Sequence, residues 1–441
     1  MRPIPRDPEA PRDETFDLPE KILCSSTDRM VSIGMESDAS DGQGRIMVFF
    51  QGHIDEEILA RAVDLTMRAE PILTYRFVNH PWRPYWQRTA QVEQKCHFKV
   101  MEGTSSDKEF SDFMARPLSP TQAPQIRVRV FRSDNDVLCI RLNHMIMDGG
   151  GAIAYLSMLS SLYRELERDP EYLPTVNLER MQIPREVLRR GGLLPAIRGL
   201  PSIQVPGSTW GINREGGDCS GRAFITRTIL PDRLAAIRSY AREEGVTIND
   251  VLLTALYRSL FVLVDPPMGQ PLRAEVPINL RRYLPDGKRA IGNVAGIYFI
   301  TIDRRDGEDF KGTLQRVHGI LEKKKERQEE LAEMLFIELV LFPGMFLIEG
   351  LAKFTNFQIA HPVLSNLGII DPKVVDFGNV PVEDVHFFGP VQLPPGVGMG
   401  ASTFHQRMTL SFSYCDTAVR PSTMEQLFDL ILEELPGRMP C

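Results

Sequence analysis

The sequence predicts an α+β fold with two domains, and two observations support this class. Strand-like and helix-like segments are mixed along the chain rather than strictly alternating. The 441 residues exceed what one simple hydrophobic core usually organises. Hydrophobic residues make up 43% and charged residues 25% of the chain, which is the balance of a soluble globular protein. We therefore expect two cores of mixed structure.

The first predicted strand covers residues 45–52, and the segment after it has the pattern of a helix. Asp55 can cap that helix, because its side chain can accept hydrogen bonds from the first backbone N–H groups. Apolar residues then recur at helical spacing, at positions 58, 59, 62, 63 and 65. Glu70-Pro71 is expected to end the helix, and residues 72–78 are expected to form the next strand.

Two further strands are predicted over residues 126–131 and 137–142, paired around a polar turn. In the first of them, apolar residues alternate with arginines, as expected of a half-buried strand. A glycine run at 149–151 follows the second strand. A helix is expected from about Ala152 to Leu166.

The second half of the chain starts a new unit of the same mixed kind. A strand over 222–230 leads into a helix over 231–244. A long apolar helix over 251–264 follows, with Thr247 or Asn249 as its cap. The strand over 273–278 runs into Asn279-Leu-Arg-Arg282. These elements predict a second lobe.

The chain is expected to divide into four parts. Residues 1–20 are rich in proline and charge and should form a flexible arm. In the segment from 181 to 220, proline and glycine are frequent and the periodicity fades, which is typical of a linker. The N-terminal lobe then covers 21–180 and the C-terminal lobe covers 221–441.

Three segments have ordinary structural interpretations. The charged run at 322–327 is expected to be the solvated face of a helix. The apolar stretch at 331–357 is interrupted by charged residues and by Pro343-Gly344, so no membrane span is expected. We expect a kinked, buried helical hairpin, with an interfacial helix as the alternative. The glycines at 395–401 follow prolines instead of a strand, so we expect a flexible loop and no dinucleotide site.

Charge and cysteine usage narrow the function classes. The net charge of −7 argues against a nucleic-acid partner. The six cysteines are far apart and form no C-x-x-C pair, so no metal site is expected. The N-terminus lacks the apolar core of a signal peptide. We expect a cytoplasmic protein in a reducing compartment.

Asn143-His-Met-Ile-Met-Asp-Gly149 is the segment that carries chemistry. His144 follows a strand almost directly, and a neutral imidazole there can accept a proton from an attacking hydroxyl or amine. Asp148 can be an acid–base partner, or it can hold the loop through an arginine. The glycines permit close backbone approach and positive φ angles. The alternative is an ordinary histidine in a turn, although chance predicts on the order of 0.04 such motifs in this composition.

The motif and its surroundings resemble the chloramphenicol-acetyltransferase-like superfamily, which includes condensation domains, polyketide-associated acyltransferases, alcohol acetyltransferases and the plant BAHD acyltransferases. The shared motif there is H-H-x-x-x-D-G or H-x-x-x-D, and Asn143 departs from the longer form. Weaker matches follow in the same order along most of the chain. They are Glu70–Phe77, Thr247–Leu253, Val276–Arg282, Ile291–Val294, Ser365–Gly368 and Asp376–Gly378.

The resemblance implies two α/β lobes that form a V-shaped pseudo-dimer around a central tunnel. His144 would be the catalytic base in mid-tunnel. Asp148 would be structural and would pair with an arginine, and Arg281 is favoured over Arg76 and Arg68. Gly149 and Asp376 would be structural as well.

The resemblance also suggests groups that could contact the reacting atoms. Ser365 and Asn366 are candidates for an oxyanion or substrate contact, although both could simply form a turn. Asn143 is a third candidate. Of the other histidines, His386 and His405 lie in the part of the chain that could reach the tunnel, but no spacing assigns them a role.

The expected activity is acyl transfer from a thioester to a hydroxyl or amine, without a covalent enzyme intermediate. No bound cofactor is expected. The co-substrate would be acyl-coenzyme A or an acyl-phosphopantetheine carrier, and the chain would act as a monomer in natural-product or lipid biosynthesis. Condensation chemistry on a separate carrier protein is the first alternative. A non-catalytic relative that only binds a ligand is the second.

Overall fold

The computed structural model describes residues 18–80, 82–89, 97–102, 106–178, 183–202, 210–285, 291–341 and 361–437. The elements of the first half are β1 (Lys21–Leu23), α1 (Ser26–Glu36), β2 (Gln43–Phe50), α2 (Glu56–Ala69), η1 (Pro71–Thr74), β3 (Tyr75–Val78), β4 (Tyr85–Arg88), β5 (Phe98–Glu102), α3 (Ser106–Ala115), β6 (Ile126–Arg132), β7 (Asp136–Asn143), α4 (Gly149–Arg168), α5 (Ile183–Gly191), α6 (Leu193–Gly199) and η4 (Leu200–Ser202).

The elements of the second half are β8 (Ala223–Ile229), α7 (Pro231–Glu243), α8 (Ile248–Val264), β9 (Pro271–Asn279), η5 (Leu280–Tyr283), β10 (Ala295–Asp303), α9 (Phe310–Glu326), α10 (Glu329–Leu341), β11 (Val363–Ile369), η6 (Pro372–Val374), β12 (Val382–Phe388), β13 (Gly398–Phe404), β14 (Arg407–Tyr414) and α12 (Pro421–Glu434). The predicted α+β class is confirmed.

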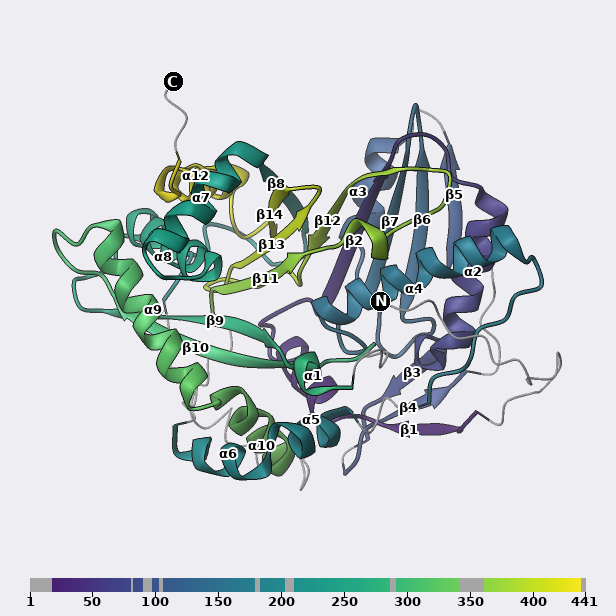
Figure 1. Ribbon diagram of the computed structural model, residues 1–441, viewed down its shortest axis with the longest axis horizontal. Helices are drawn as coiled ribbons and strands as arrows, with labels where there is room; N and C mark the ends of the chain where they lie inside the picture. The colour runs from purple at the N-terminus through teal and green to yellow at the C-terminus, as the bar shows by residue number, and fades with distance from the viewer. Residues whose placement is uncertain are drawn as a thin grey trace.

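A five-stranded sheet in the order β12-β2-β7-β6-β5 organises the first core. Helices α2 and α4 pack against each other and cover one face of this sheet (Figure 1). Asp55 caps α2 as predicted, because its carboxylate accepts hydrogen bonds from the backbone N–H groups of Glu57 and Ile58. The predicted strands β6 and β7 pair antiparallel. Strand β7 therefore ends in the middle of the sheet, directly before His144.

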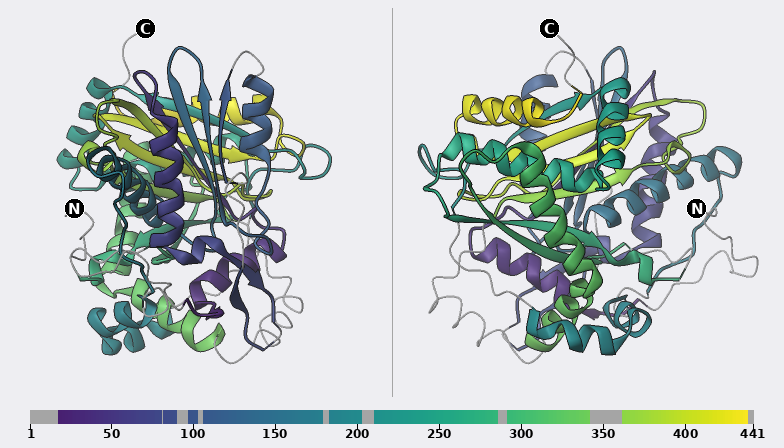
Figure 2. Two further views of the ribbon diagram at one scale, coloured as in Figure 1. Left: turned by 90° about the vertical axis from the view of Figure 1, so that its right-hand side faces the viewer. Right: turned by 60° about the vertical axis from the view of Figure 1, so that its left-hand side comes forward.

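A six-stranded sheet in the order β10-β9-β11-β13-β14-β8 organises the second core. Helices α7, α8, α9 and α12 supply the buried residues on one of its faces. Figure 2 (right) shows α9 in green and α12 in yellow in front of this face. Thr247 and Asp250 form a capping box at the start of α8, so Thr247 and not Asn249 is the cap.

Strand β12 connects the two cores. It lies in the second half of the sequence but pairs antiparallel with β2 at the edge of the five-stranded sheet. It also contacts β13 and β14 of the six-stranded sheet. The second half of the chain thus completes the sheet of the first half. The division into lobes at 181–220 and the V-shaped arrangement stay predictions, and residues 1–17 of the expected arm lie outside the described residues.

Two predicted boundaries in the first half were wrong. The strand expected over 72–78 begins only at Tyr75, because Pro71 starts a 3-10 turn whose residues Ile72 and Leu73 are buried in the core. The helix expected from Ala152 begins at Gly149, and the glycine run is its first turn. Glycine is unfavourable inside a helix, so we expect that close contacts at these positions leave no room for a side chain.

The predicted linker at 181–220 contains helices α5 and α6. Both pack against α10. A Cβ on Gly191 would lie 2.7 Å from the Leu331 side chain, and one on Gly199 would lie 2.6 Å from the Cβ of Ala332. These glycines therefore permit helix packing, which explains why they were mistaken for loop residues.

Two of the remaining predictions need correction. The charged run at 322–327 is helical in α9, but Lys324 is buried, so the run is not wholly a solvated face. The loop expected over 395–401 is strand β13 from Gly398 onward.

The stretch predicted as a hairpin is only partly described. Its first part is α10, and its kink at Pro343-Gly344 lies outside the described residues. Within the described ranges, no single helix has the length and apolarity to cross a bilayer. The pair α7 and α8, bent by 101°, meets that test by length and composition only.

Candidate functional site

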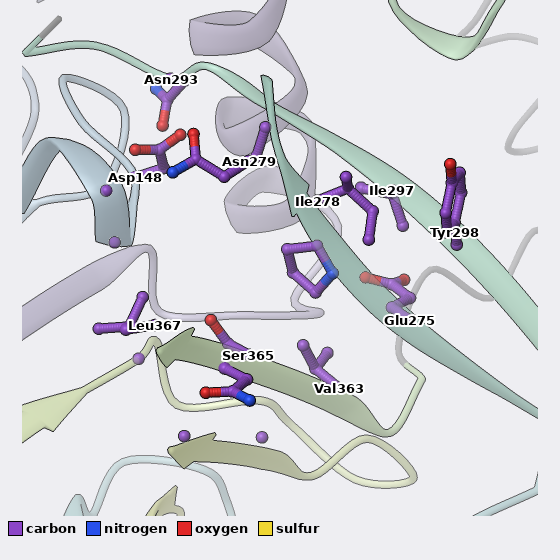
Figure 3. A pocket seen from close by; sticks show the side chains of 18 of the residues that line it. Asp148, Glu275, Ile278, Asn279, Asn293, Ile297, Tyr298, Val363, Ser365 and Leu367 are labelled. Carbon is purple, nitrogen blue, oxygen red and sulfur yellow. The ribbon is translucent and has the colours of Figure 1, made fainter. Parts of the chain in front are cut away.

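A cavity of about 1120 Å³ is lined by residues of both cores. Strand β9 contributes Glu275, Pro277 and Asn279, which alternate along one face of the strand. Ala274 and Val276, on the opposite face of the strand, belong to the second core, whereas Ile278 both packs against that core and borders the cavity. Figure 3 shows Asp148 and Asn293 near one end of this strand and Glu275 farther along it, with Ser365 across the space. The cavity volume is slightly above the range of roughly 300–1,000 Å³ that is typical of small-molecule binding sites.

His144 borders this cavity at the end of β7. Its backbone N–H donates to the carbonyl of Gly42 at 2.8 Å, which ties the residue to the start of β2. Its buried Nδ1 has no hydrogen-bond partner in the described part of the chain. The arrangement leaves Nε2 as the ring nitrogen that a ligand in the cavity can reach.

Burial lowers the pKa of His144 below its ordinary value of 6.5, because the charged imidazolium is poorly solvated there. The negative charge of Asp148 opposes this shift without cancelling it. The imidazole is therefore neutral at pH 7. A neutral imidazole that faces a cavity can accept a proton from a bound molecule.

Asp148 is held by an ion pair with Arg281, 133 positions later in the sequence. The guanidinium Nη2 lies 2.7 Å from Asp148 Oδ1, and Nη1 lies 3.1 Å from Oδ2. The carboxylate also accepts hydrogen bonds from the backbone N–H groups of Gly151 and Val294, at 2.8 and 2.7 Å. The acceptor capacity of the carboxylate is therefore used by the fold. The structure brings Asp148 together with Arg281 and not with Arg76, which bonds to Gln87, or with Arg68.

The electrostatics of Asp148 agree with this structural use. Burial alone would raise the pKa of its carboxyl group. The charge and hydrogen bonds of Arg281, together with the two backbone N–H groups, outweigh burial and hold the pKa below its ordinary value. An always-ionised carboxylate cannot serve as a proton donor near neutral pH, so the geometry favours a brace over an acid–base partner.

The glycines after Asp148 make room for this brace. A Cβ on Gly149 would lie 2.5 Å from the Leu367 side chain, and one on Gly150 would lie 2.5 Å from Nη1 of Arg281. One on Gly151 would lie 3.0 Å from the carbonyl of Gly292. None of the three has a positive φ. The expectation of close approach is therefore met, and the expectation of positive φ angles was wrong.

We predict that Gly150→Ala lowers stability by about 1–3 kcal/mol, because the added methyl displaces a guanidinium that Asp148 and Gly292 hold in place. Gly319→Ala is the matched control. Gly319 is inside α9 with open space at its Cβ position, so alanine should stabilise the helix by up to about 1 kcal/mol. Urea denaturation of both variants measures the difference. Equal urea midpoints for Gly150→Ala and Gly319→Ala would show that the Arg281 side chain can move away from the added methyl group at no cost.

Asn143 does not contact the cavity, so its expected role as an oxyanion or substrate contact was wrong. The residue is completely buried. Its amide donates to Gln125 Oε1 at 2.8 Å, and its Oδ1 accepts from the backbone N–H of Met145 at 3.0 Å. The side chain therefore shapes the turn that carries His144. An amide at this position can make both bonds with one planar group.

Ser365 and Asn366 both border the cavity on strand β11. Asn366 Oδ1 accepts from the backbone N–H of Gly368 at 2.9 Å, where Gly368 has φ +73°. The Asn366 carbonyl thus supports a turn, while its amide nitrogen has no hydrogen-bond partner among the described residues. The Ser365 hydroxyl has none there either, so it can donate to a ligand.

The remaining predicted residues lie away from the cavity lining. Asp376 pairs with Arg164 of α4 at 2.6 Å and accepts a hydrogen bond from the backbone N–H of Gly378, as a structural residue would. His386 lies 3.4 Å from Asp384 on β12. His405 is exposed in the turn between β13 and β14. Neither histidine lines the cavity.

Asn293 is a site residue whose role the sequence did not reveal. Its Nδ2 donates to the carbonyl of Met145 at 2.9 Å and to Asp28 Oδ1 at 3.3 Å. The neighbouring Gly292 carbonyl accepts from the backbone N–H of Asp148. The segment around Asn293 therefore holds both ends of the loop from His144 to Asp148. Its only sequence signal was the weak motif match at 291–294.

Two half-buried glutamates, Glu275 and Glu333, are further site residues that the sequence did not reveal. Both border the cavity, and both have a pKa raised to about 8 by burial. In the sequence, Glu275 is one polar residue in an alternating strand. The described residues contain no group of three or more His, Cys, Asp or Glu side chains placed to hold a metal ion.

Comparison with known proteins shows what fold surrounds this site. No family model and no curated protein match the sequence. The first condensation domain of the calcium-dependent antibiotic synthetase, in complex with a substrate analogue, has a TM-score of 0.71 and 16% identity, covering 94% of this chain and 95% of that one.

Two further structures have the same fold. Polyketide synthase associated protein 5 from Mycobacterium tuberculosis has a TM-score of 0.63 and 12% identity, covering 93% of this chain and 96% of that one. The trichothecene 15-O-acetyltransferase from Fusarium sporotrichioides has a TM-score of 0.66 and 12% identity, covering 94% and 95%. At these identities the likeness shows the fold and does not decide the reaction. The chain therefore has the same fold as these condensation-domain and acetyltransferase structures.

Proposed function

We propose that this protein transfers an acyl group from a thioester to a hydroxyl or amine, with His144 as the general base. The observation that carries the proposal is a neutral imidazole at the edge of a large cavity, beside an aspartate fully engaged by the fold. A base that is free to take a proton, next to room for two substrates, suits direct transfer.

In the proposed reaction, His144 Nε2 takes the proton of the acceptor as its oxygen or nitrogen attacks the thioester carbonyl carbon. The new bond forms, and the carbonyl oxygen becomes a tetrahedral oxyanion. The Ser365 hydroxyl and the Asn366 amide are the candidate donors to that oxyanion. When the C–S bond breaks, the leaving thiolate receives the proton from the imidazolium. The products are the acylated acceptor and a free thiol, and the enzyme returns to its starting state.

Asp148 and Arg281 act through His144 in this scheme. Their ion pair fixes the start of α4, and Asn293 fixes the carbonyl of Met145. The loop that carries the imidazole is thus held at both ends. We regard Asp148, Gly149, Arg281 and Asn293 as positioning residues.

The test is a panel of acyl-coenzyme A donors of increasing chain length, offered with alcohols and amines while free thiol is measured. Acceptor-dependent thiol release supports the proposal. If only an acylated carrier protein supports transfer, the protein is a condensation-type enzyme and coenzyme A is not its donor. The likeness to a condensation domain is the reason for including this donor in the test. Ligand binding without turnover on any donor would favour the non-catalytic alternative.

The pH dependence of kcat/KM follows from the lowered pKa of His144. A base works in its unprotonated form, so activity is present above the pKa and is lost as pH falls through it. Because burial moves that pKa below 6.5, we expect an acid limb centred below pH 6.5 and no loss of this kind near pH 7. An acid limb centred above pH 6.5 would show that the imidazole is not the buried, neutral base.

A further inference from the structure

One end of the cavity is lined by charged residues of β9, α9 and α10. They include the carboxyl groups of Glu275, Glu329 and Glu333 and the ammonium groups of Lys324 and Lys325. Lys324 Nζ lies 2.6 Å from Glu329 Oε2, so these two charges are paired. Glu275 and Glu333 are the carboxyl groups at this end of the cavity that form no ion pair among the described residues.

Glu275 projects into the cavity from β9 (Figure 3). Its carboxylate has no hydrogen-bond or ion-pair partner in the described part of the chain. Burial is the cause that raises its pKa to about 8. An ionised carboxylate without a partner costs free energy, so the Glu275 carboxyl group is mostly neutral at pH 7 and its ionised form destabilises the fold above about pH 8.

Glu333 stands close enough to Glu275 for their charges to interact. It accepts a hydrogen bond from the backbone N–H of Ile297. Its pKa is raised to about 8, mainly by burial and also by the negative charge of Glu275, while the Ile297 N–H and Lys324 oppose the shift. The negative charge of Glu275 thus disfavours ionisation of Glu333, and a bound cation would favour the ionised form of both carboxyl groups.

A neighbouring glutamate shows what a purely structural role looks like in this part of the fold. Glu330 is completely buried, and its carboxylate accepts hydrogen bonds from Arg282, Tyr283 and Tyr298. All of its partners belong to the chain. Glu275 lies on the cavity side of β9, and its carboxyl group has no such hydrogen bonds among the described residues.

Within the described ranges, the charged groups around Glu275 form their contacts with other residues. Arg273 lies two residues earlier on β9, with its guanidinium over the ring of Phe299 at 5.7 Å, and it does not act on the pKa of Glu275. Lys325 pairs with Glu322 at 2.7 Å. Burial lowers the pKa of His361 to about 4, so this imidazole is neutral.

We propose that Glu275, with Glu333 beside it, selects a substrate whose far end carries a protonated amine. This deepens the proposed function and rests on it for the identity of the reaction. Glu275 precedes Asn279 by four residues, which is about 13 Å along an extended strand. Asn279 Oδ1 lies 3.5 Å from Nη1 of Arg281, the partner of Asp148. The substrate is therefore elongated, with its cation roughly a dozen ångströms from the brace beside His144.

The sign of the pH effect is fixed by the carboxyl groups. A cation binds their ionised forms, so its affinity rises as pH increases through about 8. A primary amine with a pKa near 10.4 stays protonated in that range. Without ligand, a raised carboxyl pKa adds stability at low pH that is lost as pH rises through it. Glu275→Gln should therefore raise the melting temperature at pH 8.5.

The test measures binding and not turnover, so that its failure is distinct from failure of the proposed reaction. Isothermal titration of the full chain with octylamine and 1-octanol compares probes of equal length that differ in charge. We expect octylamine to bind at least 10-fold more tightly at pH 8.5, and this preference should shrink at pH 6. Glu275→Gln and Glu333→Gln should each reduce the preference.

Glu326→Gln is the matched control, because Glu326 is exposed on α9 outside the cavity lining. It should leave the preference unchanged. Equal binding of both probes by the unmodified chain would mean that the pair is neutral or already served by a cation of the chain, and overturns the proposal. An unchanged preference in both cavity variants, with native melting curves, overturns it as well.

Discussion

His144→Ala is expected to lower kcat/KM for acyl transfer by about 10²- to 10⁴-fold, the usual contribution of a positioned general base. The imidazole borders the cavity, its pKa is lowered by burial, and its Nδ1 has no hydrogen-bond partner among the described residues. Removing the side chain therefore takes away a proton acceptor but no structural contact of that atom. Thiol release with the best donor and acceptor measures the loss.

The control is His80→Ala, because His80 is exposed and does not line the cavity. It should retain full activity. Melting temperatures of both variants separate loss of chemistry from loss of folding. The acid limb of the pH profile should disappear in the residual activity of His144→Ala. Turnover equal to that of the unmodified chain would remove His144 from the mechanism.

Much of the first core followed from local patterns in the sequence. Asp55 capped α2, and the alternating strands β6 and β7 paired as expected, because both depend on neighbouring residues. The errors came where distant contacts decide. Pro71 started a 3-10 turn so that the two residues after it could be buried, and two glycines assigned to a linker serve helix contacts with α10.

The site shows the same limit more sharply. His144 and Asp148 were found because they lie in one short motif. The pairing of Asp148 with Arg281 joins residues 133 positions apart, and only resemblance to known proteins suggested it. Nothing in the local sequence distinguishes Glu275 from an ordinary solvent-facing strand residue. Its neighbour Glu333 comes from a helix 58 positions later, and only the fold brings them together.

Asn143 illustrates a different kind of error. It was considered for substrate contact because it precedes the proposed base in the motif. In a strand, adjacent side chains point to opposite faces, and β7 extends through Asn143. The residue next to His144 therefore faces the interior, where Gln125 and the Met145 N–H use its amide.

Asp148→Ala is expected to lower the free energy of unfolding by about 3–5 kcal/mol, because it leaves a mostly buried guanidinium without its partner. The two side chains of the pair are only 10% and 17% exposed. The variant also leaves the backbone N–H groups of Gly151 and Val294 without the carboxylate that accepts their hydrogen bonds. Since the N-terminus of α4 would lose its cap, we expect activity to fall with stability, mainly through kcat.

Asp376→Ala is the matched comparison. Its ion pair with Arg164 is a single contact of 2.6 Å at the surface, where the two side chains are 41% and 30% exposed. Exposed pairs contribute about 0–1 kcal/mol, so this variant should remain nearly as stable as the unmodified chain. Denaturation in urea at pH 7 measures the free energy of unfolding of both variants.

The carboxyl pKa of Asp148 is lowered in the fold, so the contribution of this carboxylate to stability is present above its ordinary pKa of 3.8 and is lost as pH falls below that value. The difference in the free energy of unfolding between Asp148→Ala and Asp376→Ala should therefore become smaller in acid. Equal losses at pH 7 would show that burial of the Asp148–Arg281 pair adds nothing beyond a surface contact.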